Sequence, residues 1–362
     1  MSAIPADLCS LEDYQHRAQT LLPADIWAYI SGASMDGFTQ QRNRSQLDTL
    51  LLQQRILVDG LGQGDCRTEL FGQTLTLPLL IAPLAYQKLA HPMGELASVQ
   101  AAAAQGVGFC LSTLASSTLE EVAQIAPDTA RWFQLYCQPD PDDTLNLIRR
   151  AEAAGYRALV VTADAPINGV RNAEQRSGFR LPDTVAAVNL QGLPKPEAGD
   201  SVFACWMQQA PNWNTLAEII RQTHLPVILK GVMHPADAQQ AVELGVQGII
   251  VSNHGGRVLD SQPSTIEVLP AIRRSVPAEI PVLLDSGIRR GSDIFKALAS
   301  GADAVLLGRS VFYALAVAGP FGVAHILRIL RDELEATMAL CGCARLADIK
   351  SSSLYLPLSA SI

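Results

Sequence analysis

Eight short apolar runs recur from residue 79 onward, and each is followed by a turn and a helix-like segment. The runs are nearly continuous in apolar residues, which is typical of parallel strands that are buried on both faces. Several of the helix-like segments end in glycine, a common helix stop. The eight runs are LLIAP (79–83), GFCLS (108–112), RWFQLY (131–136), RALVVT (157–162), PVILK (226–230), QGIIVS (247–252), PVLLD (281–285) and DAVLLG (303–308).

Eight strand–helix units predict an α/β fold, and specifically a (β/α)8 TIM barrel over residues 79–318. The alternative, a doubly wound sheet, would normally show GxGxxG after its first strand, and none follows LLIAP. Residues 1–78 are expected to hold N-terminal helices at 10–20 and 24–34 and a looser, strand-like stretch around 55–75. Residues 319–362 are expected to form C-terminal helices, which completes a single domain over residues 1–362.

The connection between the fourth and fifth runs is unusually long, because it covers residues 163–225. Its middle, residues 180–200, is rich in proline and glycine. Long insertions at the C-terminal face of a barrel commonly act as lids, so a lid insertion is predicted here.

Charge and cysteine content exclude several classes of protein. Lys and Arg number 27 against 35 Asp and Glu, a formal net charge of −8 with no long basic run, which argues against nucleic-acid binding. The seven cysteines include no CxxC pair, so reduced thiols and no metal site are expected. The first residues lack the pattern of a signal peptide, and the apolar stretches 75–86 and 311–324 are short and interrupted by proline. A cytoplasmic protein without a membrane span is therefore predicted.

Polar residues follow the apolar runs, at the strand ends where barrel enzymes carry their active sites. Any one of them alone is most simply a satisfied rim residue, but the whole set predicts a site. The set comprises Ala85 and Tyr86, Ser112 and Thr113, Gln134, Tyr136, Thr162, Asp164, Lys230, Ser252 to His254, Asp285, Gly308 and Arg309.

Two local motifs are more specific. Residues 285–309 place Gly287 and Gly308 after the seventh and eighth strands, with Arg289 and Arg309 beside them. Glycine, arginine and a helix N-terminus at this position form the usual phosphate site of a barrel. In the second motif, SNHGGRVLD (252–260), His254 follows a strand end and has a carboxylate available at the end of another strand, as a general base requires.

The chain resembles the FMN-dependent L-2-hydroxy-acid oxidase and dehydrogenase family. The resemblance covers about residues 8–350 and is carried by WAYISGAS (27–34), IAPLAYQKLAHPMGE (81–95), FQLYCQPD (133–140), SNHGGRVLD and the segment 285–309. It implies an FMN cofactor, a small 2-hydroxy acid as substrate, oxygen or another electron acceptor, and, by family analogy, a homotetramer.

The resemblance also implies roles for individual residues. His254 matches the family's active-site base, Asp164 its carboxylate partner, and Lys230 the lysine at flavin N1 and O2, while Tyr136 completes the catalytic set. Substrate contacts match Tyr29, Tyr136, Arg171 and Arg257, with Leu114 beside the substrate's side chain. Flavin contacts match Pro83, Ala85, Ser112, Gln134, Thr162, Lys230, Ser252, Asp285, Gly287, Arg289, Gly308 and Arg309.

The chain departs from the short-chain glycolate oxidases in places that bear on the substrate. Leu114 stands where they carry tryptophan, and Ile167 and Asn168 stand where charged or bulky residues are common. These changes predict a preference for medium or large side chains over glycolate. Ala85 matches the residue more typical of oxidases, so oxygen is the expected acceptor and hydrogen peroxide the product.

Three other functions share part of this set of residues. A quinone-linked lactate or mandelate dehydrogenase would share nearly all of these residues. Type 2 isopentenyl diphosphate isomerase, another FMN barrel, would share the phosphate site but would not need His254 and Arg257 together with Tyr29 and Tyr136. A protein that binds FMN without turnover would be expected to lack the histidine or an arginine.

Overall fold

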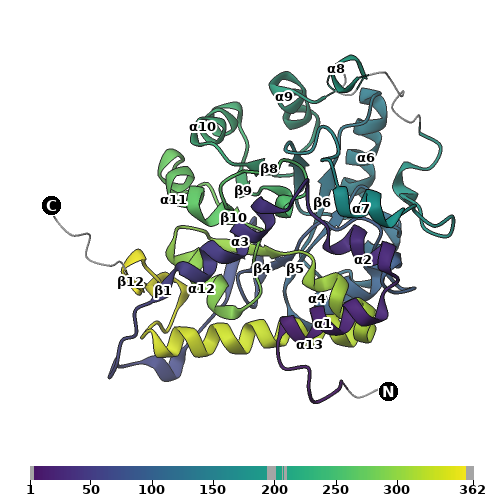
Figure 1. Ribbon diagram of the computed structural model, residues 1–362. Helices are drawn as coiled ribbons and strands as arrows, with labels where there is room; N and C mark the ends of the chain where they lie inside the picture. Colours follow the sequence, from purple (N-terminus) through teal and green to yellow (C-terminus); the bar gives the residue numbers. More distant parts are fainter. Residues whose placement is uncertain (1–3, 194–200, 206, 208–209, 356–362) are drawn as a thin grey trace.

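Eight parallel strands close into a barrel in the computed structural model, which describes residues 4–193, 201–205, 207 and 210–355 (Figure 1). Each strand pairs with its neighbours in chain order, and the last pairs with the first. All eight predicted strands are present, and the predicted (β/α)8 barrel is confirmed. They are β4 (Leu79–Ile81), β5 (Gly108–Ser112), β6 (Arg131–Leu135), β7 (Leu159–Thr162), β8 (Val227–Val232), β9 (Gly248–Val251), β10 (Val282–Leu284) and β11 (Ala304–Leu307).

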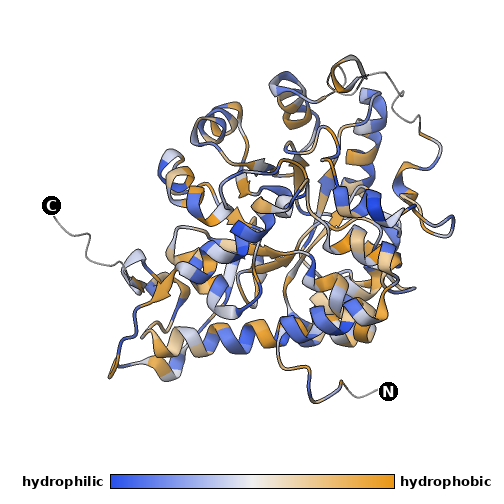
Figure 2. Ribbon diagram, viewed as in Figure 1, coloured by the Kyte–Doolittle hydropathy of each residue, from blue (hydrophilic) through white to orange (hydrophobic). Residues whose placement is uncertain are grey.

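Strand side chains alternate between two hydrophobic cores, because successive residues point to opposite faces. Leu80, Trp132 and Ile250 belong to a compact cluster that fills the barrel interior. Leu79 and Ile81 belong to the larger cluster between the strands and the helices. In Figure 2 the strands are accordingly orange, while the surrounding helices show a blue and an orange side.

The N-terminal end of the barrel is closed by a hairpin of β2 (Thr68–Leu70) and β3 (Gln73–Leu75). Leu70 and Leu75 join the interior cluster, and the Phe71 ring packs edge-on against Trp132 at 5.4 Å between ring centroids. Only the opposite end, where the strands finish, is therefore left for a ligand.

Helices surround the strands. Figure 1 shows α9 to α12 arranged around one side of the barrel and α13 running along another, with α1 beside it. The helices that follow barrel strands are α4 (Glu95–Gln105), α5 (Leu119–Ile125), α6 (Pro141–Ala153), α9 (Trp213–Gln222), α10 (Pro235–Leu244), α11 (Thr265–Ser275), α12 (Gly291–Ala299) and α13 (Ser310–Leu340).

Helix α13 is the one helix of the described residues that is long and apolar enough to cross a membrane. The expectation from the sequence, that no stretch reaches this length, holds only for the uninterrupted run. In the structure the backbone leaves the helical conformation at Ala318 and Gly319, just before Pro320, so the 31 residues of α13 are two helical parts joined across a kink. Its most apolar window is 61% buried within the fold, so it packs as a core helix.

The N-terminal segment contains three helices, α1 (Leu11–Leu21), α2 (Ala24–Ser31) and α3 (Phe38–Thr49). The second ends three residues earlier than predicted, and the third was not predicted at all. The looser stretch after them forms the β2–β3 hairpin and a short 3-10 helix at Leu61–Gln63. The predicted C-terminal helices reduce to the end of α13 and two 3-10 turns, followed by β12 (Leu354–Tyr355), which pairs with β1 (Leu51–Leu52).

The long connection after β7 contains α7 (Asn172–Ser177), a 3-10 turn at Val188–Leu190 and α8 (Val202–Cys205) before α9. Helix α7 packs against α2. Residues 194–200 of the proline- and glycine-rich middle lie outside the described residues, so the lid function stays a prediction.

Candidate active site

His254 and Asp164 meet at the open end of the barrel, just beyond β9 and β7. Nδ1 of His254 lies 3.0 Å from Oδ1 of Asp164. Gly231 makes room for the carboxylate, because a Cβ atom there would lie 2.5 Å from the Asp164 Cβ. Burial opposes ionisation of Asp164, but its interactions with His254 and Lys230 outweigh this effect and lower its pKa. The pair is therefore an imidazole with an ionised carboxylate behind it.

Lys230 lies at the end of β8, opposite Thr162 of β7. Its Nζ donates to Ser252 Oγ at 2.8 Å and forms an ion pair with Asp285 at 3.1 Å. Burial would lower the pKa of Lys230, but the carboxylates of Asp285 and Asp164 raise it overall. A permanent positive charge is thus held in the floor of the site.

The C-terminal end of α2 is held by two arginines. Nη1 of Arg257 donates to the carbonyls of Tyr29 and Gly32 at 2.8 and 2.9 Å, and Arg309 also donates to Gly32 at 2.9 Å. These carbonyls have no partner within the helix, and arginine side chains commonly satisfy such groups. The Arg257 guanidinium lies 5.3 Å from the Tyr29 ring centroid, so the helix end fixes the two side chains against each other.

Arg257, Arg289 and Arg309 are partly buried and form no ion pair with the described residues. Burial, followed by the charge of Arg171, lowers the pKa of Arg257 to about 10. Burial and Arg257 lower the pKa of Arg309 to about 9. Uncompensated positive charge of this kind is costly, so the cluster favours anionic ligands.

Arg171, at the start of α7, is close enough to contribute to this positive field. Its own charge is partly balanced, because Nη1 lies 3.2 Å from Glu174. The insertion after β7 therefore places an arginine near Arg257.

The phosphate motif differs from expectation at α12. The N–H groups of Arg289 and Arg290 both donate to Asp293 at 2.9 Å, and that of Gly291 donates to Glu333 at 2.6 Å. The start of α12 is thus occupied by protein carboxylates. Gly287 has φ 94° and faces the Asn43 backbone, which a Cβ atom would approach to 2.5 Å, so it serves the packing of α3.

The start of α13 is different. A Cβ atom added to Gly308 would meet nothing within 4 Å. The Oγ of Ser310 and the Nε of Arg309 are buried without a hydrogen-bond partner. Open space, an arginine and a helix N-terminus together suit a phosphate group.

Other orphaned polar atoms lie at the ends of neighbouring strands. Gln134 Nε2 and Thr162 Oγ1 are buried without partners, whereas Gln134 Oε1 accepts from Ser112 Oγ at 3.1 Å. Buried polar groups normally find partners, so these atoms point to a missing polar ligand. A ligand with a ring that carries nitrogen and oxygen atoms at its edge and a phosphate at its far end would pair both with these atoms and with the start of α13. FMN has this form.

Aromatic side chains gather around Tyr29, beside Arg257. The Tyr29 ring stacks on Phe179 of the insertion at 4.5 Å and lies 6.4 Å from the Tyr86 ring. Burial and the charge of Asp164 raise the pKa of Tyr136, which is near both Tyr29 and Lys230. Phe179 was not predicted, because it lies in the insertion after β7 and only the fold brings it to Tyr29.

The remaining predicted residues follow β4 and β5. Pro83 and Ala85 are partly buried just beyond β4. Leu114 is partly buried beyond β5, where its N–H donates to Ser112 Oγ at 3.1 Å. These residues thus lie at the same end of the barrel as His254 and Asp164.

The structural role of Asp260 was not predicted from the sequence. This residue closes the SNHGGRVLD segment and accepts from the N–H groups of Asp36, Phe38 and Thr39 at 3.2, 3.2 and 2.7 Å. It therefore caps α3 from another part of the chain.

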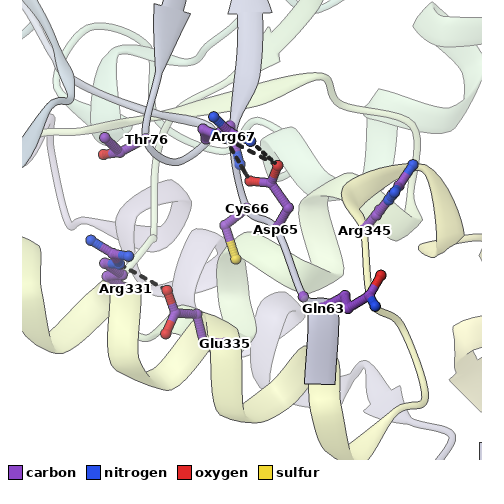
Figure 3. Close-up of a pocket in the computed structure, with 9 residues that line it drawn as sticks. Gln63, Asp65, Cys66, Arg67, Thr76, Arg331, Glu335 and Arg345 are labelled. Atoms are coloured by element: carbon purple, nitrogen blue, oxygen red, sulfur yellow. Dashed lines mark hydrogen bonds and ion pairs between the residues drawn. The ribbon is translucent and has the colours of Figure 1, made fainter. Parts of the chain in front are cut away.

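A cavity of about 500 Å³ lies away from this site, beside the β2–β3 hairpin and the C-terminal half of α13 (Figure 3). Its charged side chains are largely paired, Arg67 with Asp65 and Arg331 with Glu335. The described residues include no group of three or more His, Cys, Asp or Glu that could hold a metal.

A closed barrel with a histidine–carboxylate pair, an anion-seeking arginine cluster and orphaned polar atoms at one end defines a flavin-dependent oxidoreductase of small carboxylates. The profile of the FMN-dependent dehydrogenases matches residues 18–356. The chain belongs to this family, among the FMN-dependent 2-hydroxy-acid oxidases.

Individual relatives and solved structures are similar to this chain over most of its length. The chain is 46% identical over 357 residues to an L-lactate oxidase of Alicycliphilus denitrificans, with 97% of each chain covered. It is 41% identical to glycolate oxidase 5 of Oryza sativa subsp. japonica, with 95% of this chain and 94% of the relative covered. Among solved structures, mandelate oxidase with (S)-2-phenylpropionate is similar, at a TM-score of 0.87 and 39% identity over 96% of this chain and 98% of that one.

Proposed function

We propose that the chain oxidises an L-2-hydroxy acid to the 2-oxo acid at the His254 site and passes the electrons to oxygen. The substrate loses two electrons and two protons, and oxygen gains both to give hydrogen peroxide. The observation that carries the proposal is the His254–Asp164 pair, 3.0 Å apart, beside the unpaired Arg257. A base and a carboxylate receptor are the two groups that a 2-hydroxy acid requires.

The roles follow from charge and position. Arg257 and Arg171 hold the substrate carboxylate, and Nη2 of Arg257 has no partner among the described residues. His254 takes the proton, and Asp164 stabilises the imidazolium that forms. Tyr29 and Tyr136 border the same space and orient the substrate's oxygens.

FMN, when bound, accepts the two electrons from the substrate. The chain's own contribution is to hold the cofactor and set its charge environment. Lys230 supplies positive charge where the ring is expected, and the start of α13 with Arg309 holds the phosphate. Gln134, Thr162, Ser112 and Ser252 supply polar contacts to the cofactor. Pro83, Ala85, Asp285, Arg289 and Gly308 lie against it, and Gly287 takes part through the packing of α3.

The side-chain preference is the finer part of the proposal. Leu114 leaves more room than an aromatic residue, so side chains larger than the hydrogen of glycolate are favoured. Each methylene buried contributes about 0.8 kcal/mol. Because one methylene commonly discriminates by roughly 1–3 kcal/mol, kcat/KM is expected to rise by about tenfold or more from glycolate to an acid with a larger side chain, such as L-2-hydroxy-4-methylpentanoate.

The test is a kinetic survey of L-2-hydroxy acids of rising size with the wild-type protein and Leu114→Trp. The substitution should move the preference back towards glycolate while FMN content stays constant. If glycolate is the best substrate of the wild-type protein, the size preference is wrong.

The location and assembly of the protein complete the proposal. We propose a cytoplasmic enzyme and, by family analogy, a homotetramer. A sedimentation measurement that finds only monomer would contradict the second statement.

A further inference from the structure

Tyr86 lies near the proposed binding site for the substrate carboxylate. It directly follows Ala85 beyond β4, and its ring lies 6.4 Å from the ring of Tyr29. Tyr29 in turn lies against Arg257, the proposed carboxylate receptor. Tyr86 is therefore one aromatic ring away from the substrate's carboxylate end.

The backbone of Tyr86 is fixed towards Leu114. Its N–H donates to the Leu114 carbonyl at 3.1 Å, and its own carbonyl accepts from Leu89 at 3.0 Å. The buried Glu95 holds the neighbouring segments together, because it accepts from the N–H groups of Gln87 and Ser116 at 3.0 and 2.9 Å. The loops after β4 and β5 thus form one rigid unit.

Tyr86 also has φ 58°, a left-handed conformation that bulky residues rarely adopt. Strain of this kind persists where the surrounding structure enforces it, and it is concentrated at functional sites. The Tyr86 hydroxyl has no hydrogen-bond partner among the described residues, although the ring is partly buried. No internal hydrogen bond of the side chain therefore accounts for a tyrosine at this strained position.

We propose that the Tyr86 ring is the far wall of the substrate side-chain pocket and sets its upper size limit. Leu114 opens the pocket on the β5 side, and Tyr86 closes it from β4. The inference rests on the proposed function and narrows it: Leu114 alone would admit large side chains, whereas the Tyr86 ring limits the pocket to small and medium aliphatic ones and excludes aromatic ones.

The test compares wild type, Tyr86→Leu and Tyr86→Phe with L-lactate and L-3-phenyllactate. Tyr86→Leu should raise the kcat/KM ratio of phenyllactate to lactate by about tenfold or more, mainly through KM, because volume is released. Tyr86→Phe keeps the ring and should keep the wild-type ratio. Dissociation constants of phenylpyruvate and pyruvate, read from the flavin absorbance, should shift in the same direction.

Two outcomes would overturn the inference: a ratio that Tyr86→Leu leaves unchanged, or one that Tyr86→Phe shifts as much as Tyr86→Leu does. If Tyr86→Leu fails to fold, Tyr86→Asn removes the ring with a residue that tolerates positive φ. A wild-type protein that oxidises neither acid would instead refute the proposed function. If the wild-type protein oxidises lactate and the variants without the ring keep the wild-type preference for side-chain size, only the role of Tyr86 is refuted.

Discussion

His254 adopts φ 57°, and Gly255 after it has φ 66°. This turn places the imidazole over the strand ends, within hydrogen-bond distance of Asp164. The backbone N–H of His254 donates to Ser252 Oγ at 3.1 Å. The backbone conformation, more than the side chain's own preference, therefore aims the base. A substitution that keeps this conformation separates the chemistry from the fold.

We expect His254→Asn to keep FMN and lose flavin reduction by L-lactate by about 10²–10⁴-fold, because a positioned base contributes this much. Asparagine tolerates positive φ, so the turn should survive. Anaerobic stopped-flow measurement of flavin bleaching gives the rate, and the absorbance of the released cofactor gives the occupancy. Reduction at nearly the wild-type rate would remove His254 from the role of base.

Helix α3 depends on a contact from outside its own sequence. Its N-cap is Gly37, which offers no capping side chain, and Asp260 takes that role across the fold. Burial would raise the pKa of Asp260, but the hydrogen bonds from Thr39, Ser261 and Phe38 outweigh it and lower the pKa. The ionised carboxylate therefore contributes to the stability of the folded state.

Asp260→Asn should lower the free energy of unfolding by about 1–3 kcal/mol at pH 7. Since the folded-state pKa lies below the ordinary value of 3.8, this contribution is complete above the unfolded-state pKa and is lost as the pH falls through the folded-state pKa. Urea unfolding from pH 7 to pH 3 should show the gap to wild type shrinking below about pH 4. The exposed Asp36→Asn serves as control, and a gap that does not depend on pH would refute the argument.

The start of α13 is the element that is proposed to hold the FMN phosphate. Arg309→Ala should weaken FMN binding by about 10–100-fold, because a charge-assisted hydrogen bond contributes about 1.5–3 kcal/mol. Titration of the cofactor-free protein with FMN, followed by fluorescence, measures the effect. Arg290→Ala, an exposed arginine at α12 that pairs with Asp48, is the matched control. Full FMN occupancy of Arg309→Ala after dialysis would contradict the phosphate assignment.

At the scale of the whole molecule, the barrel could be predicted because its signal is local. Each strand is buried on both faces, so each appears as a continuous apolar run, and all eight were found within a few residues. The candidate site residues could be predicted for the same reason: Asp164 and His254 come two residues after such runs, and Lys230 lies within the last residues of one.

The features that could not be predicted from the sequence depend on contacts between segments that are distant in the chain. Helix α3 is polar around most of its circumference, and it buries Asn43 by pairing it with Asn253 at 2.8 Å, so it has no apolar stripe to detect. Phe179 reaches Tyr29 only through the folded insertion. The carboxylates that occupy the start of α12 are likewise invisible without the fold, since Glu333 lies 42 residues from Gly291.

Oxygen consumption with L-lactate, together with the flavin spectrum of the same sample, tests the central claim most directly. We expect L-lactate to bleach the flavin without air, and in air we expect one oxygen to be consumed and one hydrogen peroxide to be formed for each pyruvate. D-lactate should do neither. A flavin that stays oxidised with L-lactate and with every larger L-2-hydroxy acid would contradict the account.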